Sequence, residues 1–143
     1  MEWQHDEFII STDPGLLQLD VIHRYLSEES YWAQGRELEI TRRAVENSLS
    51  FGIYQGEKQV GFARVITDKA TFAWLADVFI LPEHRGKSLS KRLMEAILSH
   101  PELQGLRRWV LATKDAHGLY AQYGFTPMKF PERWMELPAP WAY

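Results

Sequence analysis

The sequence contains no cysteine and has no large excess of positive charge. Without cysteine among its 143 residues, disulfide bonds, thiolate metal sites and a cysteine nucleophile are excluded. Sixteen basic and nineteen acidic residues give a net charge of −3. This balance argues against a nucleic-acid-binding protein, because such proteins present a basic surface. The five histidines form no cluster in the sequence, so no metal site is expected.

Long apolar runs are also missing. No stretch approaches the roughly 18 apolar residues that a membrane-spanning helix needs. Residues 1–6 lack the basic-then-apolar pattern of a signal peptide. The sequence therefore predicts a cytoplasmic protein without membrane contact. With 45% hydrophobic residues the chain can bury a sizeable core, and its length predicts a single domain over residues 1–143.

The most informative segment is the place where an apolar strand meets an amphipathic helix. Residues 74–81 are apolar and rich in strand formers. Pro82 ends that strand, because proline cannot donate to a β-ladder. Leu89, Leu93 and Ile97 then recur at helical spacing. The pattern predicts a strand, a short loop and a helix in direct succession.

Four cations crowd the start of this helix, namely Arg85, Lys87, Lys91 and Arg92. The first N–H groups of a helix have no intrahelical partner and lie at the positive end of its dipole. Cations are unfavourable there unless an anion binds between them. The segment therefore predicts an anion site, and a solvated basic loop is the alternative interpretation.

Two common phosphate-binding loops do not fit this segment. A P-loop would need a glycine where Leu81 stands, and the dinucleotide fingerprint G-x-G-x-x-G is absent. Residues 78–87 instead resemble the segment that leads into the Arg/Gln-x-x-Gly-x-Gly/Ala loop of the GNAT (Gcn5-related N-acetyltransferase) family. Ser88 and Ser90 stand where that family usually has glycines. We expect both serines to adopt ordinary helical or capping dihedrals without a positive φ.

A second segment carries the same resemblance. Residues 116–125 are similar to the family's Ala-x-x-Leu-Tyr-x-x-x-Gly-Phe motif. Core packing is the alternative interpretation, because Leu119 and Tyr123 lie on one helix face. The family often has asparagine where Thr113 stands. Both motifs occur in order and at the usual distance, which makes an accidental match improbable.

The resemblance implies the α/β GNAT fold, also called the acyl-CoA N-acyltransferase fold. Its central sheet is mixed and mostly antiparallel, with six to seven strands flanked by about four helices. Residues 27–36 are predicted as a loop that exposes Tyr31 and Trp32. Helices are predicted at residues 14–26, at 41–47 with Ile40 directed inward, from 89 onward and at 115–123. Strands are predicted at residues 7–10, 51–54, 59–66, 71–81, 107–113, 125–126 and 133–137.

The resemblance also implies acetyl-CoA as co-substrate, with no metal. Its pyrophosphate would bind the backbone amides of the basic loop. The family distorts its central strand, so the N–H groups of Val78, Phe79 and Ile80 are candidates to polarise the acetyl carbonyl. Tyr120 matches the family's usual proton donor to the departing thiolate. The implied coenzyme-binding residues are Val78, Phe79, Ile80, Arg85, Gly86, Lys87, Ser88, Leu89, Ser90, Thr113 and Tyr120.

On the acceptor side, Asp77 is the first choice for a general base. Burial would raise its pKa, unless the carboxylate is paired. A structural or substrate-anchoring carboxylate is the alternative, and His84 and His117 are the other candidate bases. An aromatic acceptor pocket with one carboxylate suits a small amine that carries an apolar or flat group. For its two tryptophans, a core position or a homodimer contact stays open. The residues assigned to this pocket are Tyr31, Trp32, Asp77 and Trp134.

The implied reaction is transfer of the acetyl group of acetyl-CoA to a primary amine of a small molecule or peptide. The amine would attack directly in a ternary complex. A non-catalytic CoA-binding regulatory module of the same fold is the alternative, and such a module would not need Tyr120. A nucleotide-phosphate binder is disfavoured by the failed P-loop match.

Overall fold

The computed structural model describes residues 1–142. It groups the chain into two units, Met1–Ala112 and Thr113–Tyr143, and each unit is described by itself. The single domain predicted over the whole length stays a prediction.

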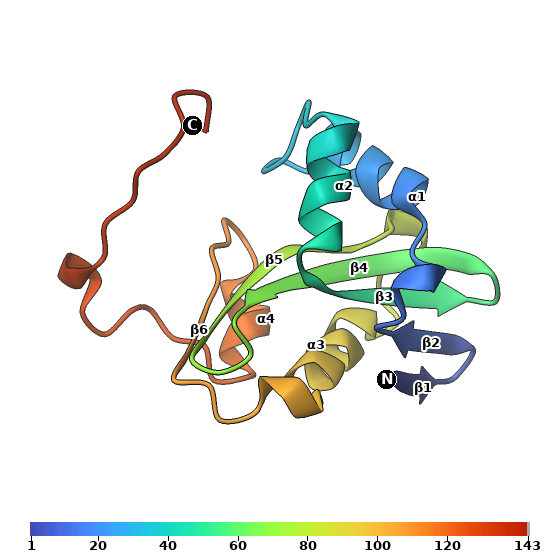
Figure 1. Cartoon of the computed structure of the whole chain (residues 1–143). Helices are drawn as coiled ribbons and strands as arrows, with labels where there is room; N and C mark the ends of the chain where they lie inside the picture. The colour runs from blue at the N-terminus through green and yellow to red at the C-terminus, as the bar shows by residue number, and fades with distance from the viewer. Residues whose placement is uncertain (143) are drawn as a thin grey trace. The chain divides into compact units, whose positions relative to one another are not determined.

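A six-stranded sheet forms the frame of the first unit, with its strands in chain order (Figure 1). The first five strands pair antiparallel in succession, and the sixth pairs parallel with the fifth. The sheet confirms the predicted α/β fold, mixed and mostly antiparallel. The strands are β1 (Glu2–His5), β2 (Phe8–Ser11), β3 (Leu49–Gln55), β4 (Lys58–Thr67), β5 (Phe72–Ile80) and β6 (Arg108–Val110).

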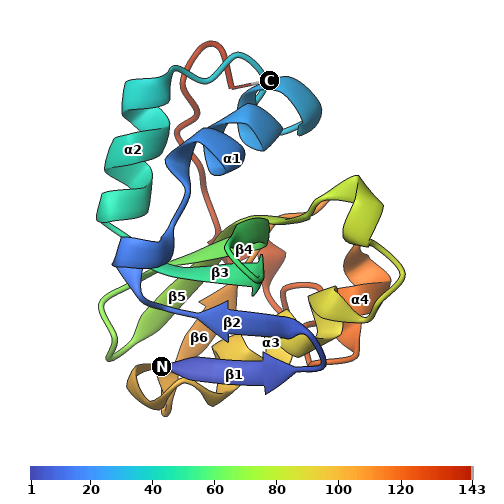
Figure 2. The ribbon, with the colours of Figure 1, turned by 90° about the vertical axis from the view of Figure 1, so that its right-hand side faces the viewer.

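Helices cover both faces of this sheet. Figure 2 shows α1 (Leu19–Arg24) and α2 (Leu38–Glu46) on one side and α3 (Leu89–Ser99) on the other. A π-helical turn, η2 (Tyr25–Glu29), continues α1. Four short 3-10 turns each begin with proline, whose fixed φ and missing N–H suit a first helical position. They are η1 (Pro14–Leu16), η3 (Pro82–His84), η4 (Pro101–Leu103) and η5 (Pro131–Arg133).

A compact apolar cluster fixes the α1–η2 segment on the sheet. The ring of Tyr25 stacks on the ring of Phe79, with centroids 4.2 Å apart. Phe62 of β4 lies beside Phe79 in the same cluster, which Ile22, Leu26 and Ala33 complete. On the other face, α3 buries the stripe that the sequence predicted, with Leu89, Leu93 and Ile97 at most 2% exposed.

Helix α2 differs from its predicted orientation. Ile40, expected to point inward, is 44% exposed, whereas Thr41 is fully buried. The Thr41 hydroxyl lies 2.9 Å from His23 Nδ1, so a hydrogen bond between helices occupies the inner face. Among residues 1–142, no helix has the length and apolar character needed to cross a bilayer.

Two of the predicted strands are wrong. Residues 125–126 and 133–137 are not in strands, and η5 begins at Pro131 instead. Segment 133–137 has strand-forming residues, but a strand also needs a neighbouring strand for its backbone groups. At the other end of the chain, the predicted strand at residues 7–10 is β2. Its hairpin partner β1 was missed, and Asp6, with φ of 51°, forms the turn between them.

Candidate functional site

The pairing between β4 and β5 is interrupted in the middle of the sheet. Asp77 and Val78 of β5 lie opposite the single residue Ala63 of β4, which is the geometry of a β-bulge. Asp77 has φ of 53°, a left-handed conformation that is uncommon for residues other than glycine. The distortion of the central strand that the resemblance implied is therefore present, and it is centred on Asp77.

One edge of β5 is open beyond this bulge. β6 pairs only with Phe72–Trp74, and within residues 1–142 no other strand occupies that edge. On the opposite edge, the N–H of Leu81 donates to the carbonyl of Val60 at 2.9 Å. Because N–H directions alternate along a strand, the Ile80 amide points to the open edge and the Phe79 amide points to β4. Of these two predicted donors, Ile80 has the suitable direction.

The bulge places the Asp77 carboxylate in a buried ion cluster. Its Oδ1 accepts from Trp32 Nε1 at 2.7 Å, and its Oδ2 accepts from Arg36 Nη1 at 2.9 Å and Arg64 Nε at 2.6 Å. Arg64 Nη1 also donates to Ser48 Oγ at 3.2 Å. Burial alone would raise the pKa of Asp77, but the guanidinium groups of Arg64 and Arg36 lower it below its ordinary value.

This cluster disfavours the role of general base that we expected for Asp77. A base needs an available lone pair and a pKa near the working pH, whereas both oxygens of Asp77 already accept and its pKa is lowered. The alternative of a paired, structural carboxylate fits the contacts. His84, another candidate base, packs edge-on against Phe8 with ring centroids 5.9 Å apart.

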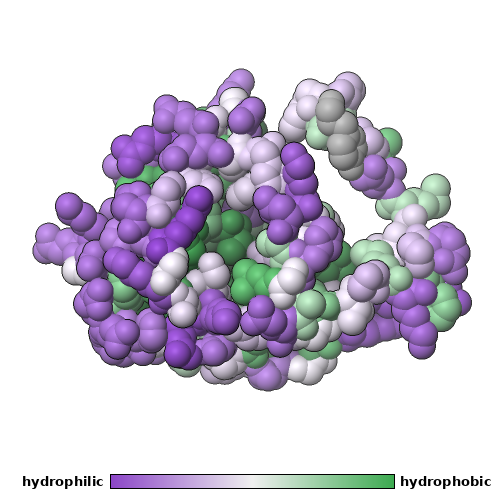
Figure 3. Space-filling view, turned by 180° about the vertical axis from the view of Figure 1, so that it is seen from behind, coloured by the Kyte–Doolittle hydropathy of each residue, from purple (hydrophilic) through white to green (hydrophobic). Residues whose placement is uncertain are grey.

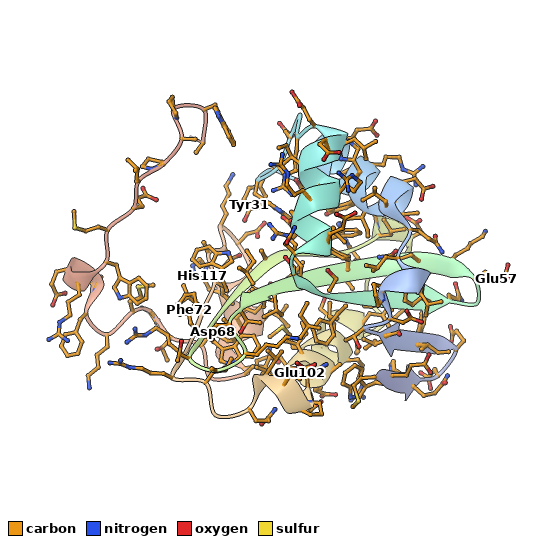
Figure 4. The ribbon with its side chains drawn as sticks, viewed as in Figure 1. Tyr31, Glu57, Asp68, Phe72, Glu102 and His117 are labelled. Atoms are coloured by element: carbon orange, nitrogen blue, oxygen red, sulfur yellow. The ribbon has the colours of Figure 1, made fainter. Side chains whose placement is uncertain are left out.

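Two predicted acceptor residues lie next to the ion cluster. Tyr31, labelled in Figure 4, and Trp32 project from the loop between η2 and α2. Their rings meet edge to face with centroids 5.0 Å apart. Tyr31 is 48% exposed and Trp32 is 40% exposed. The indole is fixed through its N–H on Asp77, so it presents a positioned aromatic surface.

The basic loop presents unpartnered backbone donors. Within the described chain, no backbone carbonyl accepts from the N–H groups of residues 86–90. Gly86 and Ser88 have φ of 81° and 61°. Backbone turned in this way directs successive N–H groups into an anion-binding concavity, and here the N-terminus of α3 adds its dipole. The geometry therefore fits a phosphate group.

The expectation that both serines avoid a positive φ is wrong for Ser88. Ser88 is left-handed and makes no capping hydrogen bond with its side chain, so it reproduces the backbone that a glycine would adopt at lower cost. Ser90 lies within the first turn of α3 and has the expected helical conformation.

This difference between the serines gives opposite predicted effects on stability. Ser88→Gly should raise the free energy of unfolding by up to about 1 kcal/mol, because it relieves the left-handed strain. Ser90→Gly, the matched control, should lower it by about 0.5 kcal/mol, because glycine is a poorer helix former. Urea unfolding of both variants measures this. A shift of the same sign in both would contradict the assigned backbone conformations.

The side chains of Arg85 and Lys87 contact residues of neighbouring elements. Arg85 Nε donates to the carbonyl of Ile80 at 3.1 Å, and Arg85 Nη2 donates to the Tyr25 hydroxyl at 2.9 Å. Lys87 Nζ lies 5.6 Å from the centroid of the Phe8 ring. Arg85 therefore ties the loop to β5 and to η2, a role that the sequence pattern did not indicate.

The second unit contains the predicted proton donor on α4 (His117–Ala121). The Tyr120 ring is 8% exposed and meets the ring of Phe125 at 6.0 Å. Thr113 Oγ1 accepts from the Ala116 N–H at 3.1 Å, ahead of the helix. Gly124, with φ of 93°, follows it as predicted. Because Tyr120 and Thr113 lie in this unit, their contribution to the coenzyme site stays a prediction.

Trp134, the remaining predicted acceptor residue, also lies in the second unit. It follows η5 and is 38% exposed, while Met135 and Leu137 are 96% and 99% exposed. Figure 3 shows hydrophobic and hydrophilic side chains mixed along this terminal segment. The acceptor role of Trp134 stays a prediction. Within residues 1–142, no three or more histidines or carboxylates gather in a way that would hold a metal ion.

Comparison with known proteins identifies the family. The model of the acetyltransferase (GNAT) domain matches residues 46–127. A candidate acetyltransferase of Gibberella zeae is 33% identical over 142 residues, covering 84% of this chain and 79% of its own length.

Solved structures agree with this assignment. A candidate GNAT acetyltransferase of Xanthomonas campestris pv. campestris is 54% identical, covers 96% of both chains and has a TM-score of 0.92. A predicted acetyltransferase of Clostridium acetobutylicum, solved with acetyl-CoA, is 16% identical, covers 92% of this chain and 94% of its own, and has a TM-score of 0.61. The second likeness concerns the fold alone. The chain belongs to the GNAT acetyltransferase family.

Proposed function

We propose that this chain is an N-acetyltransferase that moves the acetyl group of acetyl-CoA to a primary amine of a small molecule. The observation that carries the proposal is the succession of two features along one strand of the first unit. The bulged β5 has an open edge up to Ile80, and the loop of unpartnered N–H groups follows at residues 86–90. In one extended co-substrate, a carbonyl could accept a hydrogen bond at the β5 edge while a pyrophosphate accepts from the loop.

The loop residues would hold the phosphate end of the co-substrate. The N–H groups of residues 86–90 supply hydrogen bonds, and Lys87 adds a positive charge beside them. The Clostridium acetobutylicum protein of the same fold was solved with acetyl-CoA, which supports this co-substrate here.

The open edge of β5 would hold the reacting end. The Ile80 N–H is placed to donate to a carbonyl oxygen as negative charge develops on it. Because Asp77 is engaged in its ion cluster, the proton of the attacking amine would leave through water. With no cysteine in the chain, direct attack in a ternary complex is favoured over a cysteine acyl-enzyme.

Tyr120→Phe tests the predicted proton donor. We expect kcat to fall by about tenfold, because general acid catalysis contributes roughly 10²–10⁴-fold and a thiolate is already a tolerable leaving group. Acetyl-CoA affinity and melting temperature should barely change, because the ring that packs on Phe125 is kept. Steady-state kinetics beside melting curves measure this.

Tyr123→Phe is the matched control, because it removes a hydroxyl three residues further along the chain. Its kcat should stay at the wild-type value. If Tyr120 only packs in the interior, Tyr120→Phe would change stability and leave turnover per folded molecule unchanged. That pattern would reject the proton-donor role.

A ligand series tests the function as a whole. Only a bound ligand raises the melting temperature, so acetyl-CoA should raise it and ATP should not. An amine library assayed for free CoA should then give turnover, with intersecting double-reciprocal plots for a ternary complex. Binding of acetyl-CoA without CoA release from any amine would instead indicate the non-catalytic regulatory module.

A further inference from the structure

The ion cluster around Asp77 carries more positive than negative charge. Arg36 and Arg64 are permanently charged, and Asp77 is the only carboxylate that pairs with either of them among residues 1–142. The cluster therefore holds a surplus of one positive charge at the bulge. A surplus charge in a cluster that is mostly removed from water is unfavourable unless an anion compensates it.

The two arginines share the carboxylate unequally. Arg64 is 12% exposed in its side chain and uses both Nε and Nη1 in hydrogen bonds. Arg36 is 20% exposed in its side chain and donates to the cluster only through Nη1. The surplus charge is therefore accessible mainly on Arg36, whose guanidinium keeps a planar edge for a bidentate anion.

An aromatic side chain is hydrogen-bonded to the same carboxylate. The Trp32 indole donates to Oδ1 of Asp77 while Arg36 donates to Oδ2. Trp32 is also 40% exposed. A ligand with a flat or apolar part and an anionic group would satisfy both surfaces at once. Asp77 directly precedes Val78 in the bulge, so this position adjoins the strand edge proposed to hold the acetyl group.

From these contacts we infer that the acceptor amine carries an anionic group, a carboxylate or a phosphate, which pairs with Arg36 beside the Trp32 ring. The inference rests on the proposed acetyltransferase function and narrows its substrate class. It adds an anionic group to the acceptor expected from the sequence, a small amine that carries an apolar or flat group.

Matched substrates test the inference with the intact protein. Tryptophan and tryptamine differ in a carboxylate, and tyramine O-phosphate and tyramine differ in a phosphate. The anionic member of at least one pair should have a kcat/KM roughly 10–100-fold higher, as expected when a hydrogen-bonded charge is present or absent. The pair that shows the preference identifies the anion. Equal kcat/KM values within both pairs would overturn the inference.

Arg36→Gln locates the preference. It should reduce the ratio of anionic to neutral kcat/KM by roughly 10–100-fold, and Arg36→Lys should restore part of it. Arg42, on the exposed surface of α2, pairs with Glu39 and Glu46 of the same helix. Arg42→Gln is therefore the control that should leave the ratio unchanged. An unchanged ratio in Arg36→Gln would overturn the assignment.

Binding without turnover separates this inference from the proposed function. In calorimetry, wild-type protein should bind indole-3-propionate or phenyl phosphate, and it should not bind neutral indole-3-propionamide. This binding measurement uses the wild-type protein, so it tests the inference even if Arg36→Gln fails to fold. Anion binding without acetyl transfer would reject the acetyltransferase proposal alone. Acetyl transfer to amines with no preference for these anions would reject the inference alone.

Discussion

Asp77→Asn should lower the free energy of unfolding by about 3 kcal/mol, because it leaves two partly buried guanidinium groups without a counter-charge. Both oxygens of Asp77 accept hydrogen bonds from Trp32, Arg36 and Arg64, and its side chain is 3% exposed. Asparagine has the same size and also tolerates the left-handed φ of 53° at this position. The loss therefore reports on charge and not on backbone strain.

Urea unfolding monitored by tryptophan fluorescence measures this effect. Glu39→Gln is the control, because it removes a carboxylate from an exposed pair with Arg42. Exposed ion pairs contribute little to stability, so its unfolding midpoint should match that of the wild type. If Asp77→Asn also matched the wild type, the ion cluster would not hold the bulge.

The stability difference between the wild type and Asp77→Asn should depend on pH in the acid range. The ordinary pKa of the Asp77 carboxyl is 3.8, and in the folded protein it is lowered. A lowered folded pKa contributes stability that is fully present above the unfolded pKa and is lost as pH falls through the folded pKa. The stability difference between wild type and Asp77→Asn should therefore be constant near neutral pH and shrink below about 3.8.

Local patterns account for what the sequence predicted correctly. Around Pro82, the apolar pattern of the strand, the proline that ends it and the helical spacing that follows all lie close together in the sequence. Such local signals were enough to identify β5, the basic loop and α3. The family resemblance rests on this segment and on the second motif at residues 116–125. Ser88 shows the limit of this approach, because its left-handed φ of 61° belongs to a loop whose usual glycine has been replaced.

Contacts between distant positions account for what the sequence did not reveal. Asp77 pairs with Arg36 across 41 positions and with Arg64 across 13 positions, and no periodicity links them. The paired carboxylate was one of two alternatives at the sequence level, and only the fold identifies its partners. A signal existed in the isolated charges of Arg64 and Asp77 within apolar strand patterns, since buried charges are usually paired.

The strand predicted at residues 133–137 is wrong although the local pattern favours it. Their strand propensity is real, but a strand forms only where another strand offers backbone partners, and the second unit contains none among residues 113–142.

Lys87→Glu and Arg85→Met should separate coenzyme affinity from loop stability. Lys87 Nζ lies over the Phe8 ring, and glutamate near a helix N-terminus interacts favourably with the dipole. Lys87→Glu should therefore leave the unfolding midpoint almost unchanged while weakening acetyl-CoA binding roughly 10–100-fold, the value of a charged hydrogen bond. Arg85→Met removes the donors to Ile80 and Tyr25, so it should lower the free energy of unfolding by about 1–3 kcal/mol.

Calorimetric Kd values for acetyl-CoA and urea midpoints of both variants test whether Lys87→Glu mainly loses affinity and Arg85→Met mainly loses stability. Arg92→Gln is the control for net charge, because it removes a nearby cation from the first turn of α3. The guanidinium of Arg92 already pairs with Glu95 at 3.0 Å. Its effect on Kd should be clearly smaller than that of Lys87→Glu. Equal weakening by both would mean that only the net charge of this region matters. If Lys87→Glu bound acetyl-CoA like the wild type, the phosphate would not lie on this loop, because a carboxylate beside a bound pyrophosphate must repel it.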